Sequence, residues 1–357
     1  MRGSHSLESL FQYAREYKFN DFNKLLTELE ISQPQETLGE AFLLRAQIKL
    51  YIADYTILND LEKISRFSGP IKFPCLFGIW RTDAPNRFIV FPKTPGALPG
   101  FLRALPQVRQ TLNPWYGQQA DIAVRQIQSE IHYFLGEIPE ALELAEEQHH
   151  CATKNNLDAI LTQGLRFRCY LALFKPRQAE QCMLDMIRLS QAHPECLATY
   201  NSLRWWANLT TNWNGDSPRF YDDQRGVKMP VLEDRLTVVR MGGGNTTQLE
   251  EPFMLFAKHS DENVYAIRQY YMDLFHAMYW FQAGDLQQTE LYFLRLNRLA
   301  LDSGVFMPFV ECGEQITPLL RFVKESNWDC SAKWLDMIIS RAEQYEAGIE
   351  AYQNYEA

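Results

Sequence analysis

Two stretches of helical periodicity, separated by Ala283-Gly284-Asp285, constrain the fold of this chain more than any other feature. In the first stretch, apolar residues recur at spacings of three and four, which places them on one face of a helix: Ile267, Tyr271, Leu274, Met278 and Phe281. Gly284 can end that helix and Asp285 can cap the next one. A second apolar face follows at Leu286, Phe293, Leu296 and Ala300. The pattern predicts two antiparallel helices that need neighbours of the same kind to cover their apolar side.

Neighbours of this kind are present elsewhere in the chain. Segments 7–31, 36–67, 123–148 and 157–190 each show two apolar-periodic runs joined by a short break. Ala141 and Ala179 hold equivalent places about 38 residues apart, and a small residue soon after the break is typical of tetratricopeptide repeats, whose standard period is about 34 residues. The sequence therefore predicts a mostly α-helical fold, a tetratricopeptide-like helical-repeat array or α-solenoid with longer helices.

Two segments interrupt the helical pattern. Segment 68–114 is rich in proline and aromatic residues, and its apolar runs 75–80 and 87–91 predict a small β-hairpin with a long loop, followed by a short helix over 101–112. Segment 211–262 is irregular and contains Gly242-Gly243-Gly244, which lacks the lysine and the following helix of a phosphate-binding loop.

The predicted organisation follows from these interruptions. Residues 1–6 are expected to be the remnant of an expression tag, and residues 7–67 to form N-terminal helical hairpins. The first insertion, with the β-hairpin, is predicted over 68–114, and tetratricopeptide-like repeats follow over 115–210. The glycine-containing insertion covers 211–262, and C-terminal helical repeats cover 263–357. Residues 348–357 are expected to form a short acidic tail.

Composition excludes several classes of function. The 357 residues carry 44 acidic and 35 basic side chains, a net charge of -9, so nothing supplies the basic face that binding of nucleic acid by this segment would need. No apolar run is long enough to span a membrane. Seven cysteines without a Cys-x-x-Cys pair favour a reducing cytoplasm.

Motifs for catalysis and for cofactors are not apparent. The sequence lacks a Gly-x-Ser-x-Gly nucleophile motif and a dinucleotide-binding Gly-x-Gly-x-x-Gly after a strand. His149, His150 and Cys151 are consecutive, so in a helix they diverge and cannot all reach one metal ion. We therefore expect no enzyme, with no catalytic residues, no metal site and no cofactor.

An excess of aromatic residues is the most informative signal for function. Ligand pockets in proteins are apolar with a few polar groups, and aromatic residues gather near the two irregular segments and the helix around residue 275. The alternative is that they are ordinary core residues. The predicted ligand-binding residues are Trp80, Arg81, Trp205, Trp206, Trp213, Tyr271, Phe275, His276 and Tyr279.

A family resemblance lies in segment 300–320. Its pattern A-x3-G-x3-P-F-x3-G-E-x4-L-L resembles the end of the helical-repeat region in LuxR-type, MalT-like bacterial transcription regulators, with its fixed residues at Ala300, Gly304, Pro308, Phe309, Gly313, Glu314, Leu319 and Leu320. In that family a helix-turn-helix domain follows such a segment, and some members have a nucleotide-binding domain upstream. This chain has no Walker motif and ends where the DNA-binding domain would begin.

The resemblance implies a ligand-sensing repeat domain, expressed without its DNA-binding partner or never having had one. It also implies an inducer receptor that alters self-association, so that the partners would be a small-molecule effector and further copies of the chain, with DNA reached only through a helix-turn-helix domain. Our leading hypothesis is a small-molecule sensor whose ligand lies in an aromatic-lined cavity between the two irregular segments and the central helices of the array. The alternative is an adaptor that binds a peptide or a partner helix along a concave face.

Overall fold

The computed structural model describes residues 2–80, 86–88, 96–150, 156–197, 199–201, 203–204, 207 and 267–356. This part of the chain is mostly helical and contains no β-strand. Its α-helices, in chain order, are α1 (Arg2–Arg15), α2 (Phe19–Ser32), α3 (Gly39–Tyr51), α4 (Ile57–Ile64), α5 (Ala97–Tyr116), α6 (Gln118–Phe134), α7 (Ile138–His150), α8 (Asn156–Ala172), α9 (Pro176–Ala192), α13 (Ile267–Gln282), α14 (Leu286–Ser303), α15 (Met307–Val310), α16 (Thr317–Glu325) and α17 (Ala332–Glu356). Short 3₁₀ helices are η1 (Gln35–Leu38), η2 (Leu76–Gly78), η3 (Pro194–Cys196) and η5 (Gly313–Ile316). None of the described helices is both long and apolar enough to cross a lipid bilayer.

The predicted helical hairpins are present. Consecutive helices pack as the pairs α1 and α2, α3 and α4, α6 and α7, α8 and α9, and α13 and α14. The break before α14 is built as expected, because Gly284 has a φ of +79° and the Asp285 carboxylate accepts a hydrogen bond of 3.0 Å from the backbone N–H of Gln288. Gly136, in the break between α6 and α7, has the same left-handed conformation, with a φ of +74°.

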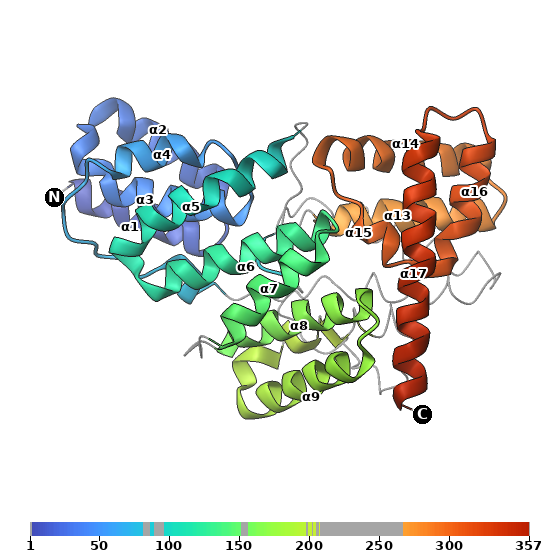
Figure 1. Cartoon of the computed structure of the whole chain (residues 1–357). Helices are drawn as coiled ribbons and strands as arrows, with labels where there is room; N and C mark the ends of the chain where they lie inside the picture. Colours follow the sequence, from blue (N-terminus) through green and yellow to red (C-terminus); the bar gives the residue numbers. More distant parts are fainter. Residues whose placement is uncertain are drawn as a thin grey trace.

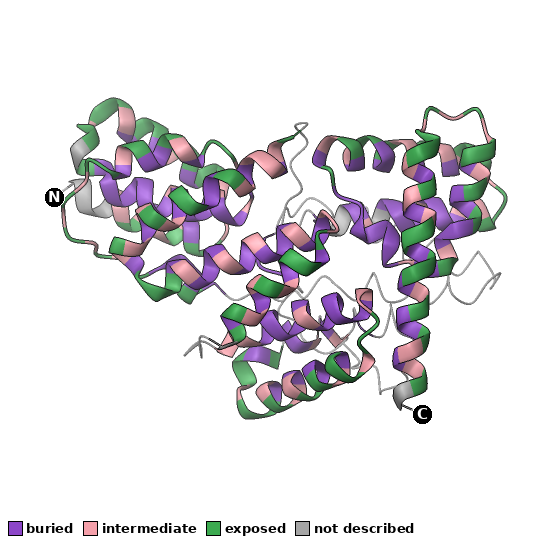
Figure 2. Cartoon of the chain, in the orientation of Figure 1, coloured by how far each residue is buried: buried purple, intermediate pink, exposed green. Residues whose placement is uncertain are grey.

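Successive pairs also pack on each other. Contacts join α4 to α5, α5 to α6 and α7 to α8, so the chain passes from the N-terminal helices through α6 and α7 to α8 and α9 (Figure 1). The C-terminal helices α13 to α17 form a second group, and α17 returns to contact both α8 and α9. Buried residues lie along the helix faces turned toward their neighbours (Figure 2), as amphipathic helices require.

The first arm of the predicted β-hairpin is not a strand. Segment 75–80 contains the 3₁₀ helix η2, and the consecutive residues Cys75, Leu76 and Phe77 are all buried, which the alternation of a half-exposed strand does not allow. The Gln47 carboxamide oxygen accepts the backbone N–H of Leu76 at 2.7 Å and holds this turn against α3. Of the second arm only 87–88 are among the described residues, so the hairpin is not confirmed.

Two helices are longer than predicted. The short helix expected over 101–112 is the longer α5, which continues through Pro106 despite the lost backbone donor. The expected C-terminal tail is the last part of α17, where the buried Tyr352 donates a hydrogen bond of 2.8 Å to Glu180 of α9. Gly348 permits this packing, because a Cβ at that position would overlap the backbone carbonyl of Leu171.

Candidate functional site

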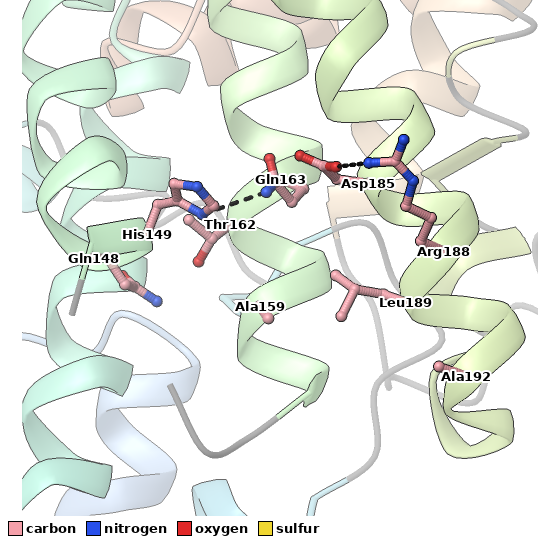
Figure 3. Close-up of a pocket in the computed structure, with 9 residues that line it drawn as sticks. All are labelled: Gln148, His149, Ala159, Thr162, Gln163, Asp185, Arg188, Leu189 and Ala192. Atoms are coloured by element: carbon pink, nitrogen blue, oxygen red, sulfur yellow. Dashed lines mark hydrogen bonds and ion pairs between the residues drawn. The ribbon is translucent and has the colours of Figure 1, made fainter. Parts of the chain in front are cut away.

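A cleft of about 520 Å³ lies between α7, α8 and α9 (Figure 3). Ala159, Leu189 and Ala192 form its apolar surface. The polar lining consists of Gln148 and His149 from α7, Thr162 and Gln163 from α8, and Asp185 and Arg188 from α9. Its volume falls within the range of small-molecule sites, and its lining combines apolar walls with a few polar groups.

The Gln148 carboxamide is the most unusual group in this cleft. Its side chain leaves α7 on the side that faces α8 (Figure 3), and the residue is only 1 % exposed. Neither its nitrogen nor its oxygen has a hydrogen-bond partner among the described residues. A buried amide without partners costs about 1–3 kcal/mol, so a protein that keeps one at a cleft leaves two hydrogen-bonding positions for something that enters it.

The neighbouring Gln163 carboxamide is held in a fixed orientation. Its oxygen accepts a hydrogen bond of 2.8 Å from the Arg166 guanidinium, which can only donate. Its nitrogen therefore lies toward His149, at 3.3 Å from Nδ1. Nδ1 of His149 thus faces the amide N–H₂ group of Gln163.

Thr162 connects the wall of the cleft to a buried polar cluster. Its hydroxyl faces both the backbone carbonyl of Asp158, at 2.8 Å, and the side-chain oxygen of Gln126 on α6, at 3.1 Å. The Gln126 nitrogen in turn donates to the Glu130 carboxylate at 2.8 Å. A chain of hydrogen bonds thus runs from the cleft to Glu130.

Glu130 binds the backbone of the proline-rich insertion. It accepts the backbone N–H groups of Arg87, at 2.7 Å, and Phe88, at 3.0 Å. Burial raises the pKa of Glu130 to about 7, although Gln126, these two N–H groups and the Arg87 charge all favour the ionised form. The guanidinium of Arg87 forms a buried ion pair with Asp158 of α8. Residues 87–88 are therefore fixed to α6 and α8 by charged and polar contacts.

A second buried cluster surrounds Glu311. Its carboxylate pairs with Arg168 of α8 at 2.8 Å and accepts the hydroxyls of Tyr133 and Tyr271, each at 2.6 Å. Burial opposes the charge of Arg168, but the Glu311 carboxylate outweighs that effect and raises the pKa of Arg168 above its ordinary value. The Arg168 guanidinium also lies over the Tyr133 ring, 4.5 Å from its centroid. This cluster joins α6 and α8 to the C-terminal helices.

Trp80, a predicted ligand-binding residue, is a packed core residue. It is 2 % exposed, and its indole N–H donates a hydrogen bond of 3.0 Å to the backbone carbonyl of Ala14. Its ring lies 4.7 Å from that of Tyr51 and 5.7 Å from that of Tyr17, centroid to centroid. The indole thus packs within the N-terminal helical region.

The predicted residues on α13 lie together on one helix but have different surroundings. Phe275 and Tyr279 are buried. Tyr271 is half-buried and donates its hydroxyl to Glu311, while its ring contacts that of Phe275. His276 is half-buried and stacks on Tyr292 of α14, with ring centroids 4.6 Å apart. These contacts belong to the packing of α13 against α14 and the Glu311 cluster.

Four predicted residues lie outside the described part of the chain: Arg81, Trp205, Trp206 and Trp213. The second irregular segment, 211–262, also lies outside it. The aromatic-lined cavity between the two irregular segments therefore stays a prediction. Within the described residues, His, Cys, Asp and Glu side chains do not gather in threes as a metal ion would require.

Sequence reasoning did not select Gln148, Thr162 or Gln163. One signal was present for Gln148, which follows Ala141 and Ala145 at helical spacing on the buried face of α7. A carboxamide on an apolar face needs a partner, so such a residue is a candidate for a core hydrogen bond or a ligand contact. Only the packed structure decides between the two, because the partners come from other helices.

Comparison with models of known protein families and with curated proteins finds no match to this sequence.

Proposed function

We propose that this chain is a sensory domain that binds a small, uncharged polar molecule in the cleft between α7, α8 and α9. The observation that carries the proposal is Gln148, a buried carboxamide without hydrogen-bond partners among the described residues, on the lining of a 520 Å³ cleft. An apolar side chain of the same size would fill the position without the cost of an unpaired amide. A ligand that supplies the partners accounts for the amide.

The charges of the cleft favour an uncharged ligand. Asp185 and Arg188 pair with each other at 3.0 Å, so their charges offset within the lining. Gln148, Thr162 and Gln163 are neutral. A charged ligand would lose its hydration here without a counter-charge reserved for it.

The cleft also has a connection through which binding can act on the rest of the chain. Thr162 lines the cleft and binds Gln126, which binds Glu130, which binds the backbone of 87–88. A ligand that draws the Thr162 hydroxyl toward itself weakens its contact with Gln126. Because a ligand shifts a conformational equilibrium through differential contacts, this path links occupancy of the cleft to residues 87–88 of the insertion.

The finer assignment is part of the same proposal. We propose a tetratricopeptide-like repeat array of the type found in LuxR-type, MalT-like regulators, acting in a reducing cytoplasm and reaching DNA only through a separate helix-turn-helix domain. The packed helical pairs and the resemblance of segment 300–320 support it.

The test is a thermal-shift screen of the wild-type chain against sets of uncharged polar metabolites. At least one compound should raise Tm in a concentration-dependent way, since a ligand that binds only the folded state stabilises it. The Ala159→Leu variant fills the cleft and should lose this shift. Ala332→Leu, which places the same side chain at an exposed position of α17, should keep it.

If the ligand still raises the Tm of Ala159→Leu, the binding site lies outside this cleft. The adaptor alternative makes the opposite prediction, a stoichiometric protein partner in a pull-down with no small-molecule shift. That combination would contradict the proposal.

A further inference from the structure

The proposed function does not specify the chemical class of the ligand. The side chains that line the cleft restrict which classes can bind. Gln148 offers an amide N–H₂ that needs an acceptor and, beside it in the same plane, a carbonyl oxygen that needs a donor. A carboxylate supplies no donor and an ammonium group supplies no acceptor. The group that satisfies both ends at once is planar and carries a donor beside an acceptor, as an amide does.

The rest of the lining distinguishes among such groups. Ala159, Leu189 and Ala192 offer apolar surface and no side-chain hydrogen bonds. A polyol, whose hydroxyls point to several sides, would lose hydrogen bonds against this surface. A flat ring with a polar edge and apolar faces would not, since its edge can meet Gln148 while its faces lie against the aliphatic side chains.

The polar residues beside Gln148 are already oriented by the protein. Gln163 is fixed by Arg166, and the Thr162 hydroxyl hydrogen is directed to Asp158 and Gln126, so the Thr162 oxygen can accept. Asp185 and Arg188 pair with each other on α9. A lining whose polar groups have fixed orientations favours specific over adaptable binding.

We propose that the cleft binds an uncharged cyclic amide, a flat ring with an N–H beside a C=O, of which the nucleobases uracil and hypoxanthine are examples. The N–H donates to the Gln148 oxygen and the C=O accepts from its nitrogen, while the ring lies against Ala159 and Leu189. This inference rests on the proposed function, because it assigns a ligand class to the same cleft.

Isothermal titration calorimetry tests it with uracil and hypoxanthine as probes. The comparison compound is 1,3-dimethyluracil, which keeps the ring and both carbonyls but has no N–H. The wild-type chain should bind at least one of the two bases, and dimethyluracil at least about tenfold more weakly than uracil, because a site that pairs with a ligand N–H discriminates strongly against an analogue without it.

The variant for this test is Gln148→Met, which keeps the size of the side chain and removes both amide groups. It should lose at least about tenfold in affinity for the base that binds. A melting curve for the variant shows that it is folded. Gln287→Met, at an exposed position of α14 and outside the cleft lining, is the control and should bind like the wild type.

Two results would overturn the inference. If dimethyluracil binds as well as uracil, or if Gln148→Met binds unchanged, the amide edge is not recognised. A second contradictory result is that neither base binds, but acetate or cis-1,2-cyclohexanediol binds to the wild type and not to Gln148→Met. The ligand is then not a cyclic amide, although the cleft is still a ligand-binding site. A complete lack of binding by these probes also rejects the class, and the wider metabolite screen then decides on the proposed function separately.

Discussion

Arg168 and Glu311 lie 143 residues apart in the sequence and form an ion pair of 2.8 Å in which both side chains are 2 % exposed. Arg168 belongs to α8, and Glu311 directly follows α15. A buried pair of this kind contributes little relative to an apolar replacement, but loss of one partner leaves the other charge buried and uncompensated. The pair therefore sets the position of the C-terminal helices on α8.

Glu311→Gln should reduce the free energy of unfolding by about 3–5 kcal/mol, because the Arg168 charge then has no counter-charge. Urea unfolding followed by circular dichroism measures this. Glu343→Gln is the control, since its ion pair with Arg321 is exposed, at 45 % and 63 %, and its loss should cost at most about 1 kcal/mol. Equal effects of the two substitutions would mean that Glu311 is not paired in a buried site.

Gly136 and Gly284 end their helices in the same left-handed conformation but differ in what surrounds them. A Cβ at Gly136 would overlap the Phe306 ring, whereas a Cβ at Gly284 meets nothing within 4 Å. Gly284→Ala should cost only the strain of the positive φ, about 1 kcal/mol. Gly136→Ala should cost about 3 kcal/mol or more, since it also displaces Phe306. Tm values of the two variants compare these costs, and the reverse order would contradict the contact between Gly136 and Phe306.

The raised pKa of Glu130 predicts that the stability of the folded chain depends on pH. The pKa of Glu130 is raised from 4.5 to about 7 in the folded state, so the folded chain holds this proton more tightly than the unfolded chain. The resulting stability is fully present below about pH 4.5 and is lost as the pH rises through about 7, a change of about 3 kcal/mol at about 1.4 kcal/mol per pKa unit. The measurement is the difference in unfolding free energy between wild type and Glu130→Gln from pH 4.5 to 8.

The difference in unfolding free energy should fall between about pH 4.5 and about pH 7 and stay constant at higher pH. Other titrating groups are common to both proteins and cancel. If the difference instead rises with pH, Glu130 is stabilised in its ionised form, and its contacts with the backbone of 87–88 outweigh its burial.

The helical hairpins could be predicted from the sequence because each of their signals is local. The apolar spacing from Ile267 to Phe281, the glycine at 284 and the cap at Asp285 all act within one or two turns of the chain. The length of α17 could not be predicted in this way. Gly348 suggests a break by itself, but its lack of a Cβ is what lets α17 lie close to the Leu171 carbonyl of α8.

The polar clusters could not be predicted, because charged residues in a sequence are usually solvated. Arg87, Glu130, Arg168 and Glu311 are buried by elements that are distant in the chain, and nothing local marks them as pairs. The surroundings of Trp80 could not be predicted either. An aromatic residue beside an irregular segment suggested a ligand site, but the indole is covered by Tyr17 and Tyr51 of the N-terminal helices.

The central claim is that the Gln148 amide is retained for a ligand at a cost to the stability of the empty protein, and Gln126 provides the matched comparison. Both carboxamides are 1 % exposed, but that of Gln126 is hydrogen-bonded at both ends, to Thr162 and Glu130. The deciding measurement is the free energy of unfolding, without ligand, of Gln148→Met and Gln126→Met. Gln148→Met should be more stable than the wild type by about 1–3 kcal/mol, and Gln126→Met less stable by a similar amount. If Gln148→Met is destabilised as much as Gln126→Met, its amide has structural partners and the account of the cleft is wrong.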